Sequence, residues 1–129
     1  MIVDSSALVA ILFKEPDAGA FAEALQRAGS RAVAAPTLVE TAMVAEGRTQ
    51  PAMGEALDEL LRAMRAEIVP FTAEHAAIAR QAWRRFGKGR HQAALNLGDC
   101  FAYALAIARD DTLLFKGDDF AQTDVKRAL

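Results

Sequence analysis

The chain has 129 residues, of which 53% are hydrophobic and 25% are charged, and its net charge is −2. This length fits one soluble globular domain, and a single cysteine, Cys100, excludes a disulfide framework or a cysteine-rich zinc site and fits a reducing cytoplasm. The slight acidity argues against a generally basic surface that wraps nucleic acid, and the absence of about 20 consecutive apolar residues argues against a membrane span.

Short strands and helices alternate along the predicted chain. In order, we expect a strand at 1–4, helices at 5–13 and 17–28, a strand at 31–35, helices at 37–47 and 51–66, a strand at 67–71, helices at 72–86 and 98–109, and a strand at 112–115. Residues 87–97 form a polar connection, 116–119 form a turn, and the last ten residues form a short helical or extended tail. This alternation predicts one α/β domain over 1–129 with a parallel sheet and right-handed crossovers.

The predicted helices carry apolar residues at helical spacing, which indicates the faces that pack against the sheet. The expected core positions are Leu8, Ile11, Leu12, Phe21, Leu25, Leu57, Leu60, Leu61, Met64, Ala76, Ile78, Ala79, Trp83, Phe101, Leu105 and Ala108. Cys100 is expected to be a small core residue, and His75 to lie on a helix surface.

Four acidic residues occupy equivalent places in the predicted topology. Asp4 follows the first strand, and Glu40 lies in the first turn of the helix after the second strand. Asp99 lies in the first turn of the helix that leads to the last strand, and Asp118 follows that strand. In a parallel α/β layout, helix N-termini and strand C-termini lie at the same edge of the sheet. We therefore expect these four carboxylates to meet at one edge.

Each acid also has a structural interpretation. Asp4 fits a helix N-cap, Thr37 with Glu40 fits a capping box, Asp99 fits a favourable helix-dipole position, and Asp118 fits a turn. Four carboxylates at one edge would repel one another unless a cation lay between them. Oxygen donors without His or Cys suit Mg²⁺ or Mn²⁺, which favours hydrolysis of a phosphodiester bond.

The densest basic run of the sequence lies between residues 80 and 91 and has two interpretations. It is either a solvated helix face and loop or a grip on an RNA backbone near the acidic edge. The candidate RNA contacts are Arg84, Arg85, Lys88, Arg90, His91 and Lys116. For Lys116 we favour local charge balance for the acids over a phosphate contact, and for Trp83 we favour core or dimer packing over stacking on a base.

Five segments in order carry a resemblance to a known family: MIVDSSAL at 1–8, PTLVE at 36–40, FGKGRH at 86–91, LNLGDCFAYALA at 95–106 and LFKGDDF at 114–120. With these segments the chain resembles the PIN-domain ribonucleases, specifically the VapC-type toxins of bacterial toxin–antitoxin pairs. The resemblance implies an α/β/α sandwich around a parallel sheet of four to five short strands. It also implies Mg²⁺-dependent endonucleolytic cleavage of RNA that inhibits translation, a cognate antitoxin and a homodimer.

The resemblance also implies roles for particular residues. It makes Asp4, Glu40, Asp99 and Asp118 the acids of the metal site, with Asp119 as the alternative fourth acid, and Ser6 a partner of the site. Metal held by Asp4 and Asp99 would orient the scissile phosphate, and Glu40 or the fourth acid would position or deprotonate the attacking water.

Two other functions remain as alternatives. A phospho-receiver signalling domain fits the length, the fold class, the early Asp4 and the late Lys116, but it requires paired acids after the first strand, where this chain has Asp4-Ser5-Ser6. It also requires an acceptor aspartate after a middle strand, which the sequence lacks. A catalytically inactive PIN binding module is the second alternative, and the retained acids argue against it.

Overall fold

The computed structural model of the protein describes residues 1–48 and 51–129. The elements are β1 (Ile2–Val3), α1 (Ser5–Leu12), α2 (Ala18–Arg27), β2 (Ala32–Ala34), α3 (Ala35–Arg48), α4 (Ala52–Ala63), β3 (Glu67–Val69), α5 (Ala73–Phe86), α6 (Leu97–Ala108), β4 (Thr112–Leu114), a 3₁₀ turn η1 (Phe120–Gln122) and β5 (Lys126–Arg127). None of the helices in the described ranges is long and apolar enough to cross a membrane.

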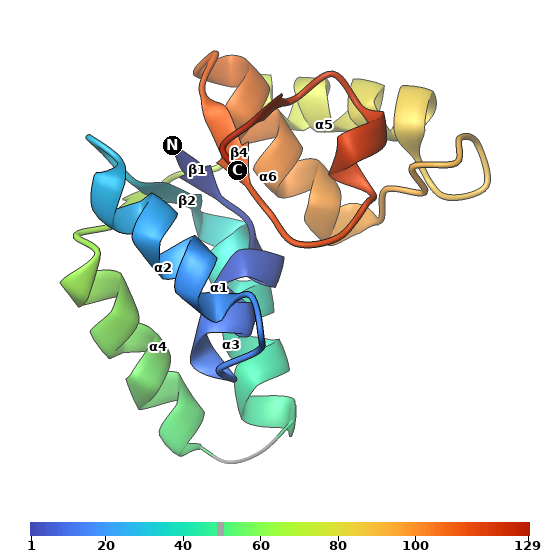
Figure 1. The fold of residues 1–129 in the computed structure, drawn as a ribbon. Coiled ribbons are helices and arrows are strands. Elements are labelled where there is room, and N and C mark those ends of the chain that lie inside the picture. Colours follow the sequence, from blue (N-terminus) through green and yellow to red (C-terminus); the bar gives the residue numbers. More distant parts are fainter. Residues whose placement is uncertain (49–50) are drawn as a thin grey trace.

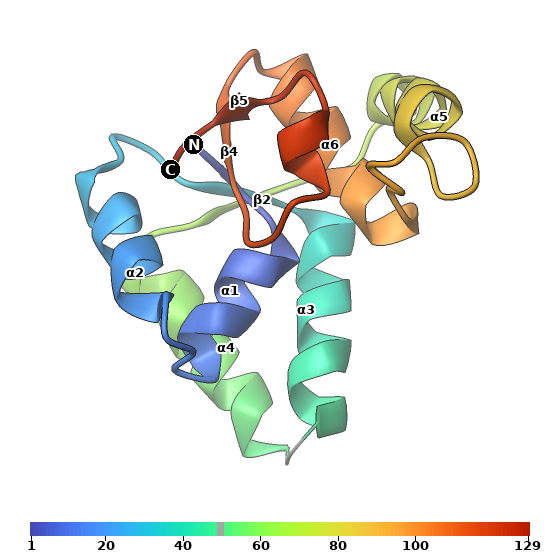
Figure 2. The ribbon, with the colours of Figure 1, turned by 45° about the vertical axis from the view of Figure 1, so that its right-hand side comes forward.

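The strands form one sheet in the order β3-β2-β1-β4-β5, and every neighbouring pair is parallel. This confirms the predicted parallel sheet, and the tail supplies its fifth strand. Helices α1 to α4 gather on one side of the sheet, and α5 and α6 cover the other side (Figures 1 and 2). The result is the expected α/β/α sandwich.

The two faces of the sheet bury alternate residues of the same strands. Ile2 and Leu113 belong to the core cluster under α5 and α6, whereas Val3, Val33 and Leu114 belong to the cluster under α1, α2 and α4. Successive side chains of a strand point to opposite faces, and strands that are covered on both sides carry continuous apolar runs. The central strands β1 and β2 are accordingly apolar throughout, whereas the edge strands β3 and β5 carry charged residues.

Helix α5 buries a face that differs in part from the prediction. Its inner stripe runs through His75, Ala82 and Phe86, which are buried, so that Ala76 and Trp83 are exposed rather than in the core. His75, predicted to lie on the surface, is buried because its Nδ1 accepts the Thr72 backbone N–H at 3.2 Å and completes a capping box. Ile78 and Ala79 pack against the core as predicted, so the buried face of α5 keeps part of the predicted stripe and extends to His75, Ala82 and Phe86.

Helix α3 begins earlier than predicted. It starts at Ala35, so Pro36 lies in its first turn instead of closing β2. Proline is well suited to that place because the first turn needs no backbone donor. The change leaves Glu40 on α3, close to its N-terminus and to the C-terminal end of β2.

Candidate active site

Asp4 ends β1 and caps the N-terminus of α1, and only 2% of its surface is exposed. Its Oδ2 accepts hydrogen bonds from the Ser6 backbone N–H at 3.0 Å and the Ser6 hydroxyl at 2.6 Å. The same hydroxyl accepts the Lys116 N–H at 3.0 Å, which ties α1 to the segment after β4. Oδ1 is buried and has no hydrogen-bond partner among the described residues, so Asp4 is held firmly with one oxygen free.

Asp99 is fixed by a capping box at the start of α6. Its Oδ2 accepts the Asn96 backbone N–H, and the Asn96 Oδ1 accepts the Asp99 backbone N–H, both at 2.9 Å. The capping interaction orients the half-buried carboxylate without neutralising its charge. The structural and functional interpretations of Asp99 are therefore compatible.

Glu40 reaches from α3 to the first turn of α6. A Cβ atom at Gly98 would overlap the Glu40 Oε2 and lie 2.5 Å from its Cδ. The missing side chain at position 98 thus makes room for the Glu40 carboxylate beside Asp99. This approach brings together acids that lie 59 positions apart in the sequence, at 40 and 99.

The charges of these acids interact. Burial raises the pKa of Asp4 to about 6 against the effect of its hydrogen bonds to Ser6, and the charge of Glu40 raises it further. Burial also raises the pKa of Asp99 to about 7, and the charges of Asp4, Asp119 and Glu40 act in the same direction. The structure therefore brings Asp4, Glu40 and Asp99 into one electrostatic cluster, and Asp119 is the neighbour from the turn after β4.

The donor set fits a hard divalent cation. No three His, Cys, Asp or Glu side chains of the described residues already form a metal cage. Mg²⁺ does not require one, because it keeps several waters and is commonly held by one or two carboxylates. The free Oδ1 of Asp4 and the raised pKa values of Asp4 and Asp99 are the features expected where carboxylates share a cation.

The side chain of Lys116 does not balance these acids, contrary to our expectation. Its ammonium pairs with Glu15 at 2.5 Å and Asp17 at 3.1 Å, on the segment between α1 and α2. Lys116 therefore contributes to the cluster through its backbone N–H to Ser6. These ion pairs could not be predicted from sequence patterns, because Glu15 and Lys116 are 101 positions apart.

The other candidate RNA contacts divide into three groups. Arg85 forms a salt bridge with Asp124, with 3.1 Å between Nη1 and Oδ2, and the Nδ1 of His91 accepts the Ala93 backbone N–H at 3.0 Å. Arg84 and Lys88 are exposed and form no salt bridge within the described ranges. Arg90 lies over the ring of Trp83, with 4.1 Å between its Cζ and the ring centroid.

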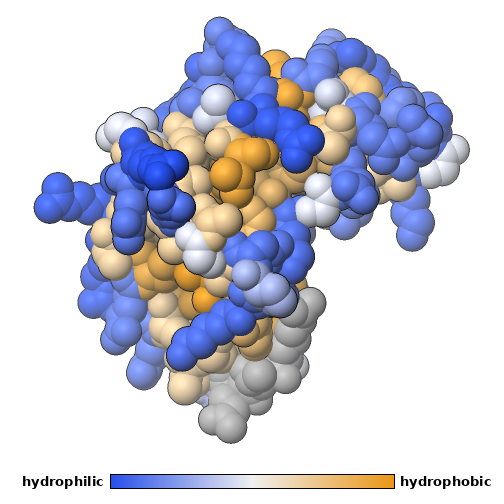
Figure 3. Space-filling view, in the orientation of Figure 1, coloured by the Kyte–Doolittle hydropathy of each residue, from blue (hydrophilic) through white to orange (hydrophobic). Residues whose placement is uncertain are grey.

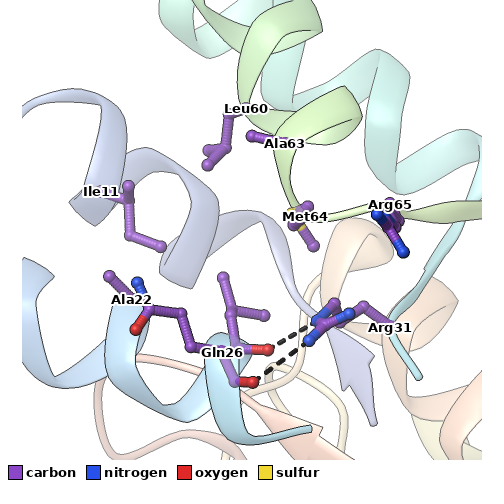
Figure 4. Close-up of a pocket in the computed structure, with 9 residues that line it drawn as sticks. Ile11, Ala22, Gln26, Arg31, Leu60, Ala63, Met64 and Arg65 are labelled. Atoms are coloured by element: carbon purple, nitrogen blue, oxygen red, sulfur yellow. Dashed lines mark hydrogen bonds between the residues drawn. The ribbon is translucent and has the colours of Figure 1, made fainter. Parts of the chain in front are cut away.

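A separate groove of about 450 Å³ lies between α1, α2 and α4 (Figure 4). Its apolar lining includes Ile11, Leu25, Leu60 and Met64, and Figure 3 shows apolar residues reaching the surface in this region. Of the described residues that line it, none is a predicted site acid. This groove is thus a second surface feature, distinct from the acidic cluster.

The stability of the metal-free protein should depend on pH in a direction set by Asp4 and Asp99. Because their pKa values are raised in the folded state, folding favours their protonated forms, and the free energy of unfolding should fall as pH rises from about 4 to 7. For Asp4 alone the loss is of the order of 3 kcal/mol. Thermal unfolding in EDTA between pH 4 and 8 measures this, and Mg²⁺ should reverse the loss. A melting temperature that rises over this range would contradict the cluster.

Comparison with known proteins gives a consistent result. The sequence model of the PIN domain matches residues 1–126. Ribonuclease VapC28 of Mycobacterium tuberculosis is 46% identical over 130 residues, which covers 100% of this chain and 98% of that protein. Ribonuclease VapC of Mycolicibacterium smegmatis is 46% identical over 125 residues, which covers 97% of each chain.

Solved structures share the fold at much lower identity. VapC20 of Mycobacterium tuberculosis, described as a sarcin-ricin loop cleaving toxin, superposes with a TM-score of 0.79 at 14% identity and covers 96% of this chain and 95% of its own. VapBC2 from Rickettsia felis, bound to a DNA fragment from its promoter, gives a TM-score of 0.75 at 16% identity, with coverages of 98% and 94%.

Proposed function

This chain belongs to the PIN-domain family and to its VapC-type ribonucleases, and from that membership we propose that it is a divalent-metal-dependent endoribonuclease, the toxin of a toxin–antitoxin pair. One observation carries the proposal: Asp4 keeps a buried oxygen without a partner beside the charges of Glu40 and Asp99. A buried carboxylate in this position costs stability unless a cation compensates it. Cleavage of RNA would inhibit translation.

The chain's own residues have distinct roles in this mechanism. Ser6 holds one oxygen of Asp4, and Asn96 holds Asp99, so both carboxylates are oriented before a metal binds. When bound, Mg²⁺ or Mn²⁺ supplies positive charge that polarises a phosphate and acidifies water. Glu40 is the group that we assign to accept the proton of the attacking water.

We propose Asp119 rather than Asp118 as the fourth acid. The charge of Asp119 is among the causes that raise the pKa of Asp99. Both are exposed in the turn that follows β4. Gly117, with φ at +96°, adopts the left-handed backbone conformation that this turn requires.

Removing the metal tests whether RNA cleavage by this protein depends on a divalent cation. Structured RNA incubated with the protein should be cleaved in Mg²⁺ or Mn²⁺, remain intact in EDTA, and be cleaved again when the ion is restored in excess. The readout is gel electrophoresis of an end-labelled RNA. Cleavage that survives chelation would refute the metal mechanism, and labelling of the protein by acetyl phosphate would favour the receiver alternative.

Two protein partners belong to the proposal. The first is a cognate antitoxin, because structural neighbours include toxin–antitoxin complexes. The apolar groove between α1, α2 and α4 is the kind of surface that an amphipathic segment covers (Figure 4).

The second proposed partner is another copy of this chain. Val39 and Met43 on α3 are 58% and 71% exposed, and apolar side chains gathered in this way mark protein interfaces.

A further inference from the structure

A groove of about 390 Å³ runs from the basic loop to the capping residue of Asp99. Its lining residues are Ala79, Arg80, Trp83, Lys88, Leu95, Asn96, Leu97 and Cys100. Asn96 is the residue that caps α6 and holds the Asp99 carboxylate. The groove therefore ends beside the acidic cluster, although none of the four acids lines it.

Trp83 is held in place in this groove and yet remains 45% exposed. The Arg90 guanidinium covers one face of its ring, with 4.1 Å between Cζ and the centroid. A Cβ atom at Gly87 would lie 2.5 Å from the Trp83 Cδ1, so the glycine lets the loop pack directly on the indole. An ordered aromatic surface that stays in water is poorly explained by folding alone, because burying it would stabilise the chain.

The cations around Trp83 are unpaired. Arg80 and Lys88 line the groove, Arg84 is exposed on the same helix, and none of the three forms a salt bridge within the described part of the chain. Arg109 and Lys126 have carboxylate partners, whereas Arg62 on α4 forms no salt bridge with any described residue and is unpaired like the cations of the groove. Unpaired cations can bind the phosphates of a single strand of nucleic acid, and an exposed aromatic ring beside them can stack on its bases.

We propose that this groove binds the single-stranded RNA segment that flanks the scissile phosphate, with a base stacked on Trp83 and phosphates at Arg80 and Lys88. This inference rests on the proposed function and adds the path of the substrate to it. Asn96 and Leu97 would place the following phosphate near Asp99, at the end of the groove.

The sequence contains a single tryptophan, so intrinsic fluorescence reports directly on this groove. In EDTA, titration with an eight-nucleotide single-stranded RNA of mixed sequence should quench the Trp83 emission to saturation. Inorganic polyphosphate of equal charge should quench much less, because it offers charge without bases. Equal quenching by polyphosphate would overturn the stacking.

Variants separate stacking from charge. Trp83→Ala should weaken the binding of labelled RNA in EDTA by about tenfold, which corresponds to the loss of one base stack, and Trp83→Phe should restore part of it. Lys88→Ala should weaken binding and reduce its salt dependence. Arg62→Ala, which removes a cation from exposed α4, is the matched control and should bind normally. Unchanged affinity of Trp83→Ala, with an unchanged melting temperature, would refute the proposal.

Two further outcomes distinguish the inference from its premise. If the wild type cleaves RNA in Mg²⁺ but its Trp83 emission does not respond to RNA, only the groove assignment fails. If quenching follows the self-association of the protein in sedimentation experiments, the groove is a contact between copies and the assignment also fails. If no RNA is cleaved in any divalent ion, the proposed function fails, whatever the binding result.

Discussion

Replacing Asp99 by asparagine is expected to lower RNA cleavage by roughly 10³-fold while leaving the protein at least as stable in EDTA. The amide oxygen can still accept the Asn96 N–H, so the cap of α6 survives. The substitution also removes the negative charge of Asp99. Burial and the charges of Asp4, Asp119 and Glu40 destabilise that charge in the folded protein. Metal stabilisation of a transition state is worth several kcal/mol, which corresponds to a rate factor of about 10³.

The experiment compares cleavage rates in saturating Mg²⁺ with melting temperatures in EDTA. Asp58→Asn removes an acid from exposed α4 and serves as the control for net charge. Asp118→Asn and Asp119→Asn, compared side by side, decide the fourth acid, and we expect the larger loss for Asp119. If Asp99→Asn cleaved RNA at the wild-type rate, or lost activity only because it unfolded, the assignment of Asp99 would be wrong.

The sequence was sufficient to predict the parallel sheet and the proximity of Asp4, Glu40 and Asp99, for a physical reason. Short strands such as Ala32–Ala34 and Thr112–Leu114 alternate with helices, and that pattern has few topologies once the strands are parallel. The chain then places every strand C-terminus and the following helix N-terminus at one edge. Asp4 and Asp99 are oriented by capping interactions within three residues of each, which local sequence also encodes.

Features that depend on packing between distant elements were not predictable. The buried face of α5 is set by its packing against α6, which places Ala82 and Phe86 in the core and leaves Trp83 exposed. The ammonium of Lys116 selects Glu15 and Asp17 because the segment after β4 lies beside the end of α1. The position of the Glu40 carboxylate depends on Gly98, because a side chain at position 98 would occupy the same space. This contact joins α3 to α6, so neither segment of sequence indicates it alone.

Gly98→Ala is expected to separate activity from stability. The new methyl group would occupy the space of the Glu40 carboxylate, which is the end of a flexible side chain and can rotate away. The free energy of unfolding should therefore change by less than about 1 kcal/mol, since alanine favours a helix over glycine. Cleavage should fall by roughly 10²-fold, because the displaced Glu40 no longer lies beside Asp99 and a misplaced catalytic group costs a factor of this size.

The chain contains a matched control for this substitution. Gly54 on α4 faces Glu46 in the same way, since a Cβ atom there would lie 3.1 Å from the Glu46 Cδ, but no predicted site acid lies in that contact. Gly54→Ala should cleave RNA normally. In a double-mutant cycle, Gly98→Ala should have little further effect once Glu40 is glutamine, because both changes remove the same carboxylate from the site. Additive losses would mean that Gly98 acts on another group, and Glu40 would then lose its assigned role.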